Sequence, residues 1–457
     1  MKEVSYELAS FSQQSSFDDL SEEVRERMKV LLLDAIACAI GSLRSEPVQF
    51  LKEQVEEFGG SSITSLIGGH KTAPDRAAFF NSALIRYLDF NDGYMGRLAT
   101  SHPSDQLGAI LAASEYANAS GRDFMTALAL AYEIQCRFCD FCSYEDKGFD
   151  QALAISYSVA CGVSRALNLD IEKTANAIGL SGASQNPLLI VRAGRISHWK
   201  GFSTANTCSN ALHATFLAMR GVTGPPEIFE GPLGLFDSIT GPFDLNLEDT
   251  SLKKILEISL KKFNAGIHSQ TAIEGVIELK EENGLVPEDI SEVEVQIYQR
   301  AYFIMGGGKG GDKHDVKNKE TADHSLPYVL AAALIDNNVM PEQFEEKRIL
   351  KEDIQSLLRC VKISNSEELT NRYPKESPVI IQIKNKENER FEKEKSSYEG
   401  HYSNPMGLSS VIEKFGLLCD DIISIQTKEE IIDTVSRIEK IQISDLTDIF
   451  SKMDIQK

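Results

Sequence analysis

The chain has 457 residues, of which 42% are hydrophobic and 25% are charged, and its formal net charge is −21. This length predicts about two domains, each large enough to bury its own core. The acidic charge and the lack of a Lys/Arg-rich tract argue against nucleic-acid binding, which needs a basic face, and no run reaches the roughly 18 apolar residues of a membrane-spanning helix.

The N-terminal residues, MKEVSYELASF, lack the basic start and apolar run of a secretory signal, so we expect a cytoplasmic protein with reduced cysteines. Cys136, Cys139 and Cys142 form a C-x2-C-x2-C run that an iron–sulfur cluster could use. They lie in an apolar, helix-like segment, the third leaves the helix face shared by the first two, and no fourth Cys-Pro follows. We therefore interpret them as small buried residues and expect neither a metal nor a cofactor.

The hydrophobic pattern is helical up to about residue 260. Ser21 begins a predicted helix whose apolar positions follow the helical period, and Gly41 is placed to end it. Alanine-rich segments follow, whose small residues permit close packing between neighbouring helices. The predicted helices span 108–119, 124–141, 152–167 and 206–220.

The pattern changes after Lys262, where Val293, Val295 and Ile297 alternate with polar residues and so indicate a half-buried strand. From Asn404 onward the pattern is helical again. The remaining predicted elements of this region are strands at 361–364, 379–384 and 391–395 and helices at 269–283 and 325–336. The sequence thus predicts a mainly α protein, with a large all-helical domain and a smaller α+β domain that holds a roughly four-stranded sheet.

Polar side chains stand among apolar ones in two neighbouring segments, Leu88–Asp92 and His102–Asp105. A carboxylate or imidazole that is buried without a partner costs several kcal/mol, so the fold must satisfy these groups or use them. Two interpretations stay open. The segments form either a hydrogen-bonded loop between helices or a reactive site.

Two groups of cations could attract an anionic ligand against the field of so acidic a chain. Arg192, Arg195 and Lys200 lie within nine residues of one another, and Lys261 and Lys262 precede His268. Arginine can clamp a carboxylate through two parallel hydrogen bonds, and lysine acts as a point charge. The alternative is that these residues are solvated surface charges.

A glycine-rich segment, MGGGKGGDKHD, occupies positions 305–315. It is not a phosphate-binding loop, because Lys309 is followed by Gly310 where the motif G-x4-G-K-[ST] requires Ser or Thr. We expect a flexible loop that can close over a ligand, with His314 in contact with solvent.

Six blocks of sequence resemble the MmgE/PrpD family, most closely its 2-methylcitrate dehydratase branch. They are LDFND at 88–92, HPSDQLGAIL at 102–111, SHWKGF at 197–202, HSQTAIE at 268–274, ETADHSLPY at 320–328 and NPM at 404–406. The resemblance implies that the C-terminal helices return to the first domain. The helical domain would then span 1–266 and 400–457, and the α+β domain 267–399.

The resemblance also implies an activity. It is that of a cofactor-free, metal-free lyase that eliminates water from 2-methylcitrate or a related 2-hydroxy tricarboxylate, in propionate catabolism and as a homodimer. Such an elimination needs a base beside a carboxylate, an acid for the leaving hydroxyl and cations for the carboxylates.

The family's motifs, matched position by position, supply the candidate site. Asp89, His102, Lys200 and His268 are the expected catalytic residues, with His102 as acid or base because an unperturbed imidazole has a pKa of about 6.5. Asp89 would orient His102, and His268 would carry the second proton. The expected substrate-binding residues are Asn91, Asp92, Ser104, Asp150, Arg192, Lys261, His324 and Tyr328. Tyr328 has core packing as its alternative.

Asp150 bears on the choice of reaction. It stands where relatives that decarboxylate cis-aconitate carry a catalytic histidine, and a carboxyl group donates a proton poorly at neutral pH unless its pKa is strongly raised. This favours dehydration. Three alternatives stay open: a cis-aconitate decarboxylase, an epimerase of a dicarboxylic amino or imino acid, and a catalytically silent homologue that binds polyanions.

Overall fold

The structure is a computed structural model that describes residues 3–456. Contacts between residues divide the chain into two units, which are described separately. Unit 1 holds the residues up to Leu189, Gly201–Ser259 and the residues from Met406 onward, and unit 2 holds Ile190–Lys200 and Leu260–Pro405. Within the described residues, none of the helices combines the length and the apolarity that crossing a bilayer requires.

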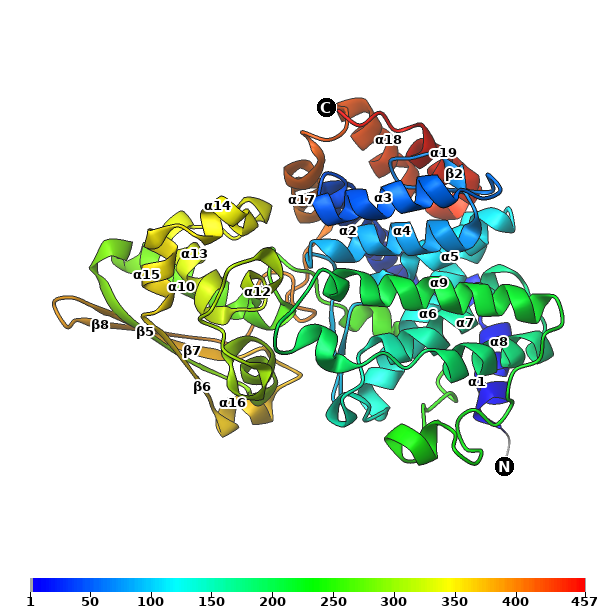
Figure 1. Cartoon of the computed structure of the whole chain (residues 1–457), viewed down its shortest axis with the longest axis horizontal. Coiled ribbons are helices and arrows are strands. Elements are labelled where there is room, and N and C mark those ends of the chain that lie inside the picture. The colour runs from blue at the N-terminus through cyan, green and yellow to red at the C-terminus, as the bar shows by residue number, and fades with distance from the viewer. Residues whose placement is uncertain (1–2, 457) are drawn as a thin grey trace. The chain divides into compact units, whose positions relative to one another are not determined.

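Unit 1 is built from helices. They are α1 Val4–Gln14, α2 Glu22–Ser42, α3 Glu46–Phe58, α4 Pro74–Tyr87, α5 Leu107–Tyr116, α6 Gly121–Phe141, α7 Ala152–Ala166, α8 Ile171–Ser184, most of α9 Trp199–Met219, α17 Leu408–Cys419, α18 Ile425–Ser436 and α19 Ile443–Lys452 (Figure 1). Two short antiparallel pairs accompany them, β1 Thr64–Ser65 with β2 Lys71–Thr72 and β3 Tyr94–Met95 with β4 Thr100–Ser101. The helical character predicted for this part of the chain is confirmed, apart from these two short strand pairs.

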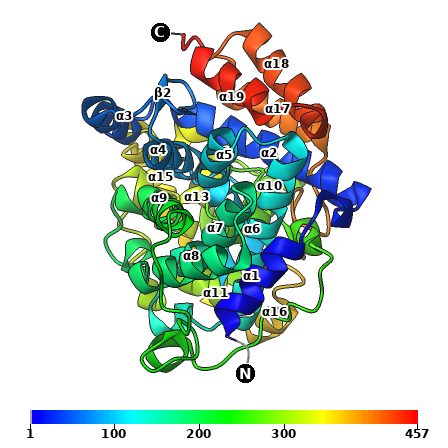
Figure 2. The same cartoon turned by 90° about the vertical axis from the view of Figure 1, so that its right-hand side faces the viewer.

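The C-terminal helices pack against N-terminal helices in unit 1. α17 and α18 lie beside α2 (Figure 2), and α19 packs against α18 and α5. Leu418 of α17 packs on Gly41, where an added Cβ atom would lie 3.2 Å from the Leu418 Cβ. α2 begins at Ser21 as predicted, and the Ser21 hydroxyl caps it by accepting a hydrogen bond from the Val24 amide at 3.3 Å. Gly41 does not end the helix, which runs on to Ser42. Its small size serves the close approach of α17 instead.

Unit 2 contains the predicted four-stranded sheet, in the order β6-β5-β7-β8. Its strands are β5 Ile290–Ile297, β6 Val361–Asn365, β7 Val379–Asn385 and β8 Arg390–Lys395. β5 pairs parallel with β6 and antiparallel with β7, which pairs antiparallel with β8. The period-two alternation has its expected cause, since Val379, Ile381 and Ile383 of β7 are buried at alternate positions.

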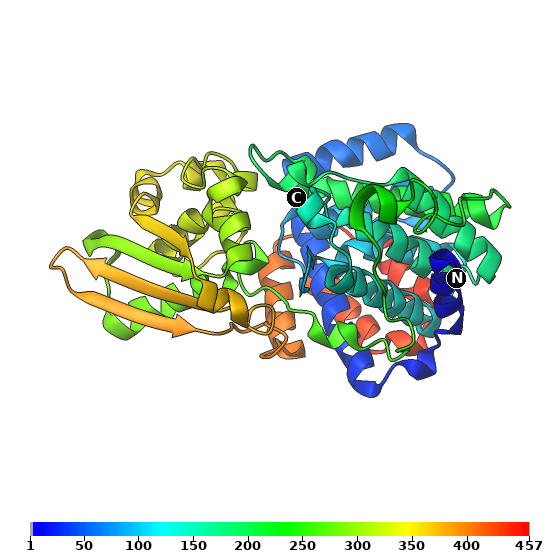
Figure 3. The same cartoon turned by 90° about the horizontal axis from the view of Figure 1, so that it is seen from below.

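Helices cover the buried face of this sheet. α10 Gln270–Asn283 and α13 Leu326–Asp336 pack on it (Figure 3), and α15 Glu352–Leu358 packs on α13. Shorter helices fill the connections: α11 Gln299–Ala301, α12 Lys319–Ala322, α14 Glu346–Ile349 and α16 Glu367–Arg372. The α10, α13 and strand side chains form one hydrophobic core, which fixes the polar segments that precede α10 and α13.

The observed division differs from the predicted limits at residues 190–200, 260–266 and 400–405, which we had assigned to the helical domain and which lie in unit 2. The segment 190–200 belongs to unit 2 because its polar groups have their partners there. The Lys200 ammonium lies 2.6 Å from the Asp323 carboxylate, and His198 lies 3.9 Å from Glu320. Its irregular sequence carries no periodic signal of these contacts.

Candidate functional site

A buried ion pair anchors the first polar segment in unit 1. α4 ends at Tyr87, and Asp89 then adopts a left-handed backbone conformation with φ of 58°, which aspartate tolerates better than most residues. Its carboxylate pairs with the Arg86 guanidinium, and both side chains are 1% exposed. Arg86 Nε also lies 3.6 Å from the Asp105 carboxylate. One guanidinium therefore balances two buried carboxylates from the two predicted polar segments.

The amide and hydroxyl groups of these segments interlock. The Asn91 amide donates to Ser104 Oγ at 2.8 Å and to the Asp105 carboxylate at 2.9 Å. Ser104 donates to one oxygen of Asp92 through its hydroxyl at 2.7 Å and through its backbone amide at 3.1 Å. The structure thus brings together four of the predicted residues, Asp89, Asn91, Asp92 and Ser104.

The carboxyl group of Asp92 has a raised pKa. Burial raises the pKa of its carboxyl group to about 7, against the two hydrogen bonds from Ser104 that lower it. The Tyr132 phenol of α6 faces the same carboxyl, and burial followed by the Asp92 charge raises the pKa of that phenol well above its ordinary value. Asp92 can therefore exchange a proton near neutral pH, while Tyr132 stays protonated.

His102 lies at the edge of this cluster with 8% of its surface exposed. Its Nδ1 lies 2.6 Å from the backbone carbonyl oxygen of Asp92, and its backbone amide donates to Gln151 Oε1 at 2.7 Å. A carbonyl can only accept, so Nδ1 carries the proton and Nε2 is the ring nitrogen that can take one up. We expected the Asp89 carboxylate to orient the ring, but the group at Nδ1 is this carbonyl, because Asp89 turns toward Arg86.

Lys414, which sequence reasoning missed, supports the LDFND segment from α17. Its ammonium donates to Asp34 Oδ1 of α2 and to the Phe90 carbonyl, both at 2.7 Å, and it stands 3.8 Å above the Phe90 ring. The sequence does contain a signal for this residue, because Lys414 lies on the same face of the helix as the apolar residues Val411 and Leu418. A lysine on a buried helix face needs a partner.

Asp150, at the start of α7, is fully buried, and its carboxylate accepts a hydrogen bond from the Ala152 amide at 3.1 Å. This contact is that of a helix N-terminus.

A second cluster lies in unit 2, around the carboxylate of Asp323. Lys200 lies 2.6 Å and Lys319 3.0 Å from its oxygens, and His324 Nδ1 lies 2.8 Å away. Burial alone would raise the pKa of Asp323, but the charges of Lys200 and Lys319 outweigh burial and hold that pKa well below its ordinary value. The structure thus joins the predicted residues Lys200 and His324 through an aspartate that we did not single out, although it stands in the ADHSLPY block.

The other predicted residues of unit 2 lie in different surroundings. His268 Nδ1 lies 2.7 Å from the Tyr298 hydroxyl, and Tyr298 stacks on Tyr373. Lys261 is fully buried, and Arg192 is half-buried on the short helix Leu189–Arg192.

Tyr328 belongs to the hydrophobic core of unit 2. Its hydroxyl donates to the Gln343 carbonyl, and its ring packs against Phe344. These contacts account for the residue without a ligand, as in the alternative we had kept open.

The cysteine run agrees with our structural interpretation. Cys136 and Cys139 lie on α6, Cys142 follows its end, and all three are buried thiols outside any disulfide. Burial raises the pKa of Cys136 and of Cys142 well above the ordinary value. The thiolate is the form that binds metals, so these surroundings oppose ligation.

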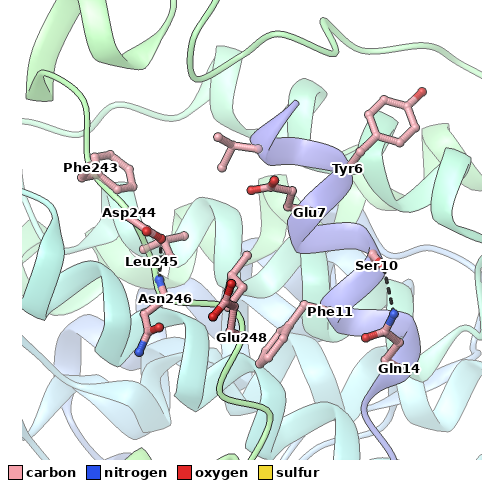
Figure 4. A pocket seen from close by; sticks show the side chains of 12 residues that line it. Tyr6, Glu7, Ser10, Phe11, Gln14, Phe243, Asp244, Leu245, Asn246 and Glu248 are labelled. Carbon is pink, nitrogen blue, oxygen red and sulfur yellow. Dashed lines mark hydrogen bonds between the residues drawn. The ribbon is translucent and has the colours of Figure 1, made fainter. Parts of the chain in front are cut away.

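A hollow of about 760 Å³ opens on unit 1 between α1 and residues 243–248 (Figure 4). Glu7, Asp244 and Glu248 line it, and none of the predicted site residues does. Its acidic lining does not suit a polycarboxylate.

Comparison with known proteins agrees with the motifs. A model of the MmgE/PrpD N-terminal domain matches residues 6–248, and a model of the MmgE/PrpD C-terminal domain matches residues 263–440. The chain is 27% identical to an alkylcitrate dehydratase of a fungal species (strain ATCC 74256), over 85% of this chain and 82% of the relative. It is 25% identical to the 2-methylcitrate dehydratase of Escherichia coli K12, over 82% of each chain, and 22% identical to the cis-aconitate decarboxylase of Mus musculus, over 97% of this chain and 92% of the relative.

Proposed function

The chain belongs to the MmgE/PrpD family, since the two domain models match most of its length, and from this premise we propose that it is a cofactor-independent dehydratase. Its substrate is 2-methylcitrate or a near relative, and its product is the corresponding alkene. The observation that carries the proposal is the hydrogen bond between His102 Nδ1 and the backbone carbonyl of Asp92. It leaves Nε2 of His102 able to accept a proton, and the same Asp92 has a carboxyl pKa raised to about 7.

The reaction requires two proton transfers in opposite directions. A base removes the proton beside a carboxylate, and an acid protonates the leaving hydroxyl. His102 Nε2 is our candidate for the first transfer, because its Nδ1 is occupied by the Asp92 carbonyl. His268, held at Nδ1 by Tyr298, is the candidate second proton carrier. Asp89 is assigned a positioning role through Arg86 rather than a role in proton transfer.

Substrate carboxylates need cations, because the net charge of the chain repels a trianion. We assign this task to Lys200, Lys261 and Arg192, with His324 beside Lys200. Asn91 and Ser104 hold the Asp92 carboxyl in place through the hydrogen bonds described above. In this proposal the chemistry rests on side chains alone and requires no bound metal or cofactor.

Decarboxylation of cis-aconitate is the second candidate, because a relative with that printed name matches nearly the whole chain. This decarboxylation requires a proton donor at the position of Asp150. The carboxyl group of Asp150 accepts the Ala152 amide at 3.1 Å, as at a helix N-terminus, and it stands in place of the histidine that decarboxylating relatives carry. Dehydration therefore remains our first proposal. We also propose, from the resemblance, a cytoplasmic homodimer that serves propionate catabolism.

The test is the ultraviolet absorbance of a new conjugated alkene, with purified protein and 2-methylcitrate, citrate or cis-aconitate supplied separately. We expect a rise with 2-methylcitrate that a chelator leaves unchanged. Loss of cis-aconitate with release of carbon dioxide, and no rise with the citrates, would replace dehydration by decarboxylation. No change with any of the three would favour an epimerase or a binding protein.

A further inference from the structure

Lys313 is a buried cation that the proposed reaction has not used. It lies in the glycine-rich segment of unit 2, and only 6% of its surface is exposed. Among residues 3–456, its ammonium has no hydrogen bond and no ion pair within 4.0 Å. A charge in such surroundings is unfavourable unless a counter-charge or a ligand compensates it.

Lys313 lies close enough to the Asp323 cluster to be affected by the charges of Lys200 and Asp323. The hydroxyl of Ser325, two residues after Asp323, donates to the Lys313 backbone carbonyl and ties the loop to the start of α13. Burial and then the positive charge of Lys200 lower the pKa of Lys313 to about 8, and the Asp323 charge only partly opposes them. Lys200, Lys313 and Lys319 thus share the single carboxylate of Asp323, which already contacts two of them.

We propose that Lys313 is a substrate-binding residue, and that together with Lys200 it forms a subsite for one carboxylate of a small organic acid. A carboxylate at this place would supply the anion that Lys313 lacks and would bridge it to Lys200. The identity of the acid rests on the proposed function, which names a tricarboxylate, whereas the anion subsite rests on the unit 2 cluster alone.

Tricarballylate tests the subsite without turnover, because this tricarboxylate has no hydroxyl group to eliminate. Its affinity is measured by isothermal titration calorimetry at about pH 7 for the full chain and three variants. We expect Lys313→Gln to weaken binding roughly 10- to 100-fold, the range for a lost charge-assisted hydrogen bond. Lys313→Arg keeps the cation and should stay within about fivefold of the wild type.

Lys317→Gln is the matched control. It removes the same charge from the same loop, but its side chain is 73% exposed and pairs with Asp315. Its binding should stay within about twofold of the wild type, because bulk charge contributes little at physiological ionic strength. Circular dichroism and the thermal midpoint verify that each variant is folded, and the Arg variant provides a readout if the Gln variant fails to fold.

The pH dependence gives a second readout. Wild-type affinity should fall as the pH rises through about 8, where Lys313 loses its proton, and the Arg variant should lack this fall. The charged and titratable groups around Lys313 are common to both proteins, so the comparison isolates residue 313. Those that act on the Lys313 charge are Lys200 and Asp323. Asp323 also contacts Lys319 and His324, and Asp312, His314 and Asp315 are neighbours of Lys313 in the sequence.

Three results would overturn the subsite: no tricarballylate binding by the wild type, binding by the Gln variant within twofold of it, or an equal loss in Lys317→Gln. Failure of the dehydratase proposal is distinguishable. In that case 2-methylcitrate is not dehydrated while the Lys313 effect on tricarballylate binding persists.

Discussion

Replacing Asp92 by Asn should make the stability of the protein less dependent on pH. An aspartate in an unfolded chain has a pKa of about 3.9, whereas burial raises that of Asp92 to about 7. Between these values the unfolded chain has lost the proton and the folded protein keeps it, so the unfolded state binds fewer protons. Stability contributed by this group therefore falls as the pH rises through the window, and the loss is complete above about 7.

The size of the effect follows from the same two pKa values. Relative to the wild type, Asp92→Asn should gain about 2 kcal/mol of unfolding free energy between about pH 5.5 and pH 8. Asparagine keeps an oxygen that can accept the two Ser104 hydrogen bonds, so packing should change little. The assay is urea unfolding followed by circular dichroism, with the exposed Asp454→Asn as control. A difference between wild type and Asp92→Asn that stays constant across this pH range would refute the argument that burial raises the Asp92 pKa.

The remaining predictions concern three other side chains. His102→Gln should lower turnover of the substrate by about two to four orders of magnitude with an unchanged circular dichroism spectrum, and near-normal turnover would remove His102 from the mechanism. Lys414→Met should lower the free energy of unfolding in urea by about 3–5 kcal/mol, because Asp34 loses a buried partner. Combining it with Asp34→Asn should recover much of that loss. Full stability of the single variant would contradict the buried pair. Lys200→Met should raise KM roughly 10- to 100-fold in steady-state kinetics, since it removes a cation assigned to a substrate carboxylate; an unchanged KM would argue against that role.

The fold was predictable where the signal is local. The period-two alternation of Val293, Val295 and Ile297 and the helix start at Ser21 depend on neighbours in the chain, and both are confirmed. α4, Pro74–Tyr87, was missed although its proline at the first turn is a recognised start signal. α9 begins at Trp199, seven residues before the start we predicted at 206.

The candidate site was predictable in part, because motifs name residues but not their partners. Asn91, Asp92 and Ser104 do form one hydrogen-bonded cluster. Lys414 and Asp34 form a pair across 380 residues of sequence, and no local pattern links them. The left-handed turn at Asp89 directs its carboxylate to Arg86, which periodicity does not reveal.

The most direct test of the central claim is proton NMR of 2-methylcitrate in deuterated buffer with purified protein that has been treated with a chelator. We expect the substrate signals to disappear, a single alkene product to appear without loss of carbon dioxide, and His102→Gln to abolish both changes. Substrate signals that remain unaltered at high protein concentration, or that require an added metal ion to change, would contradict cofactor-independent dehydration.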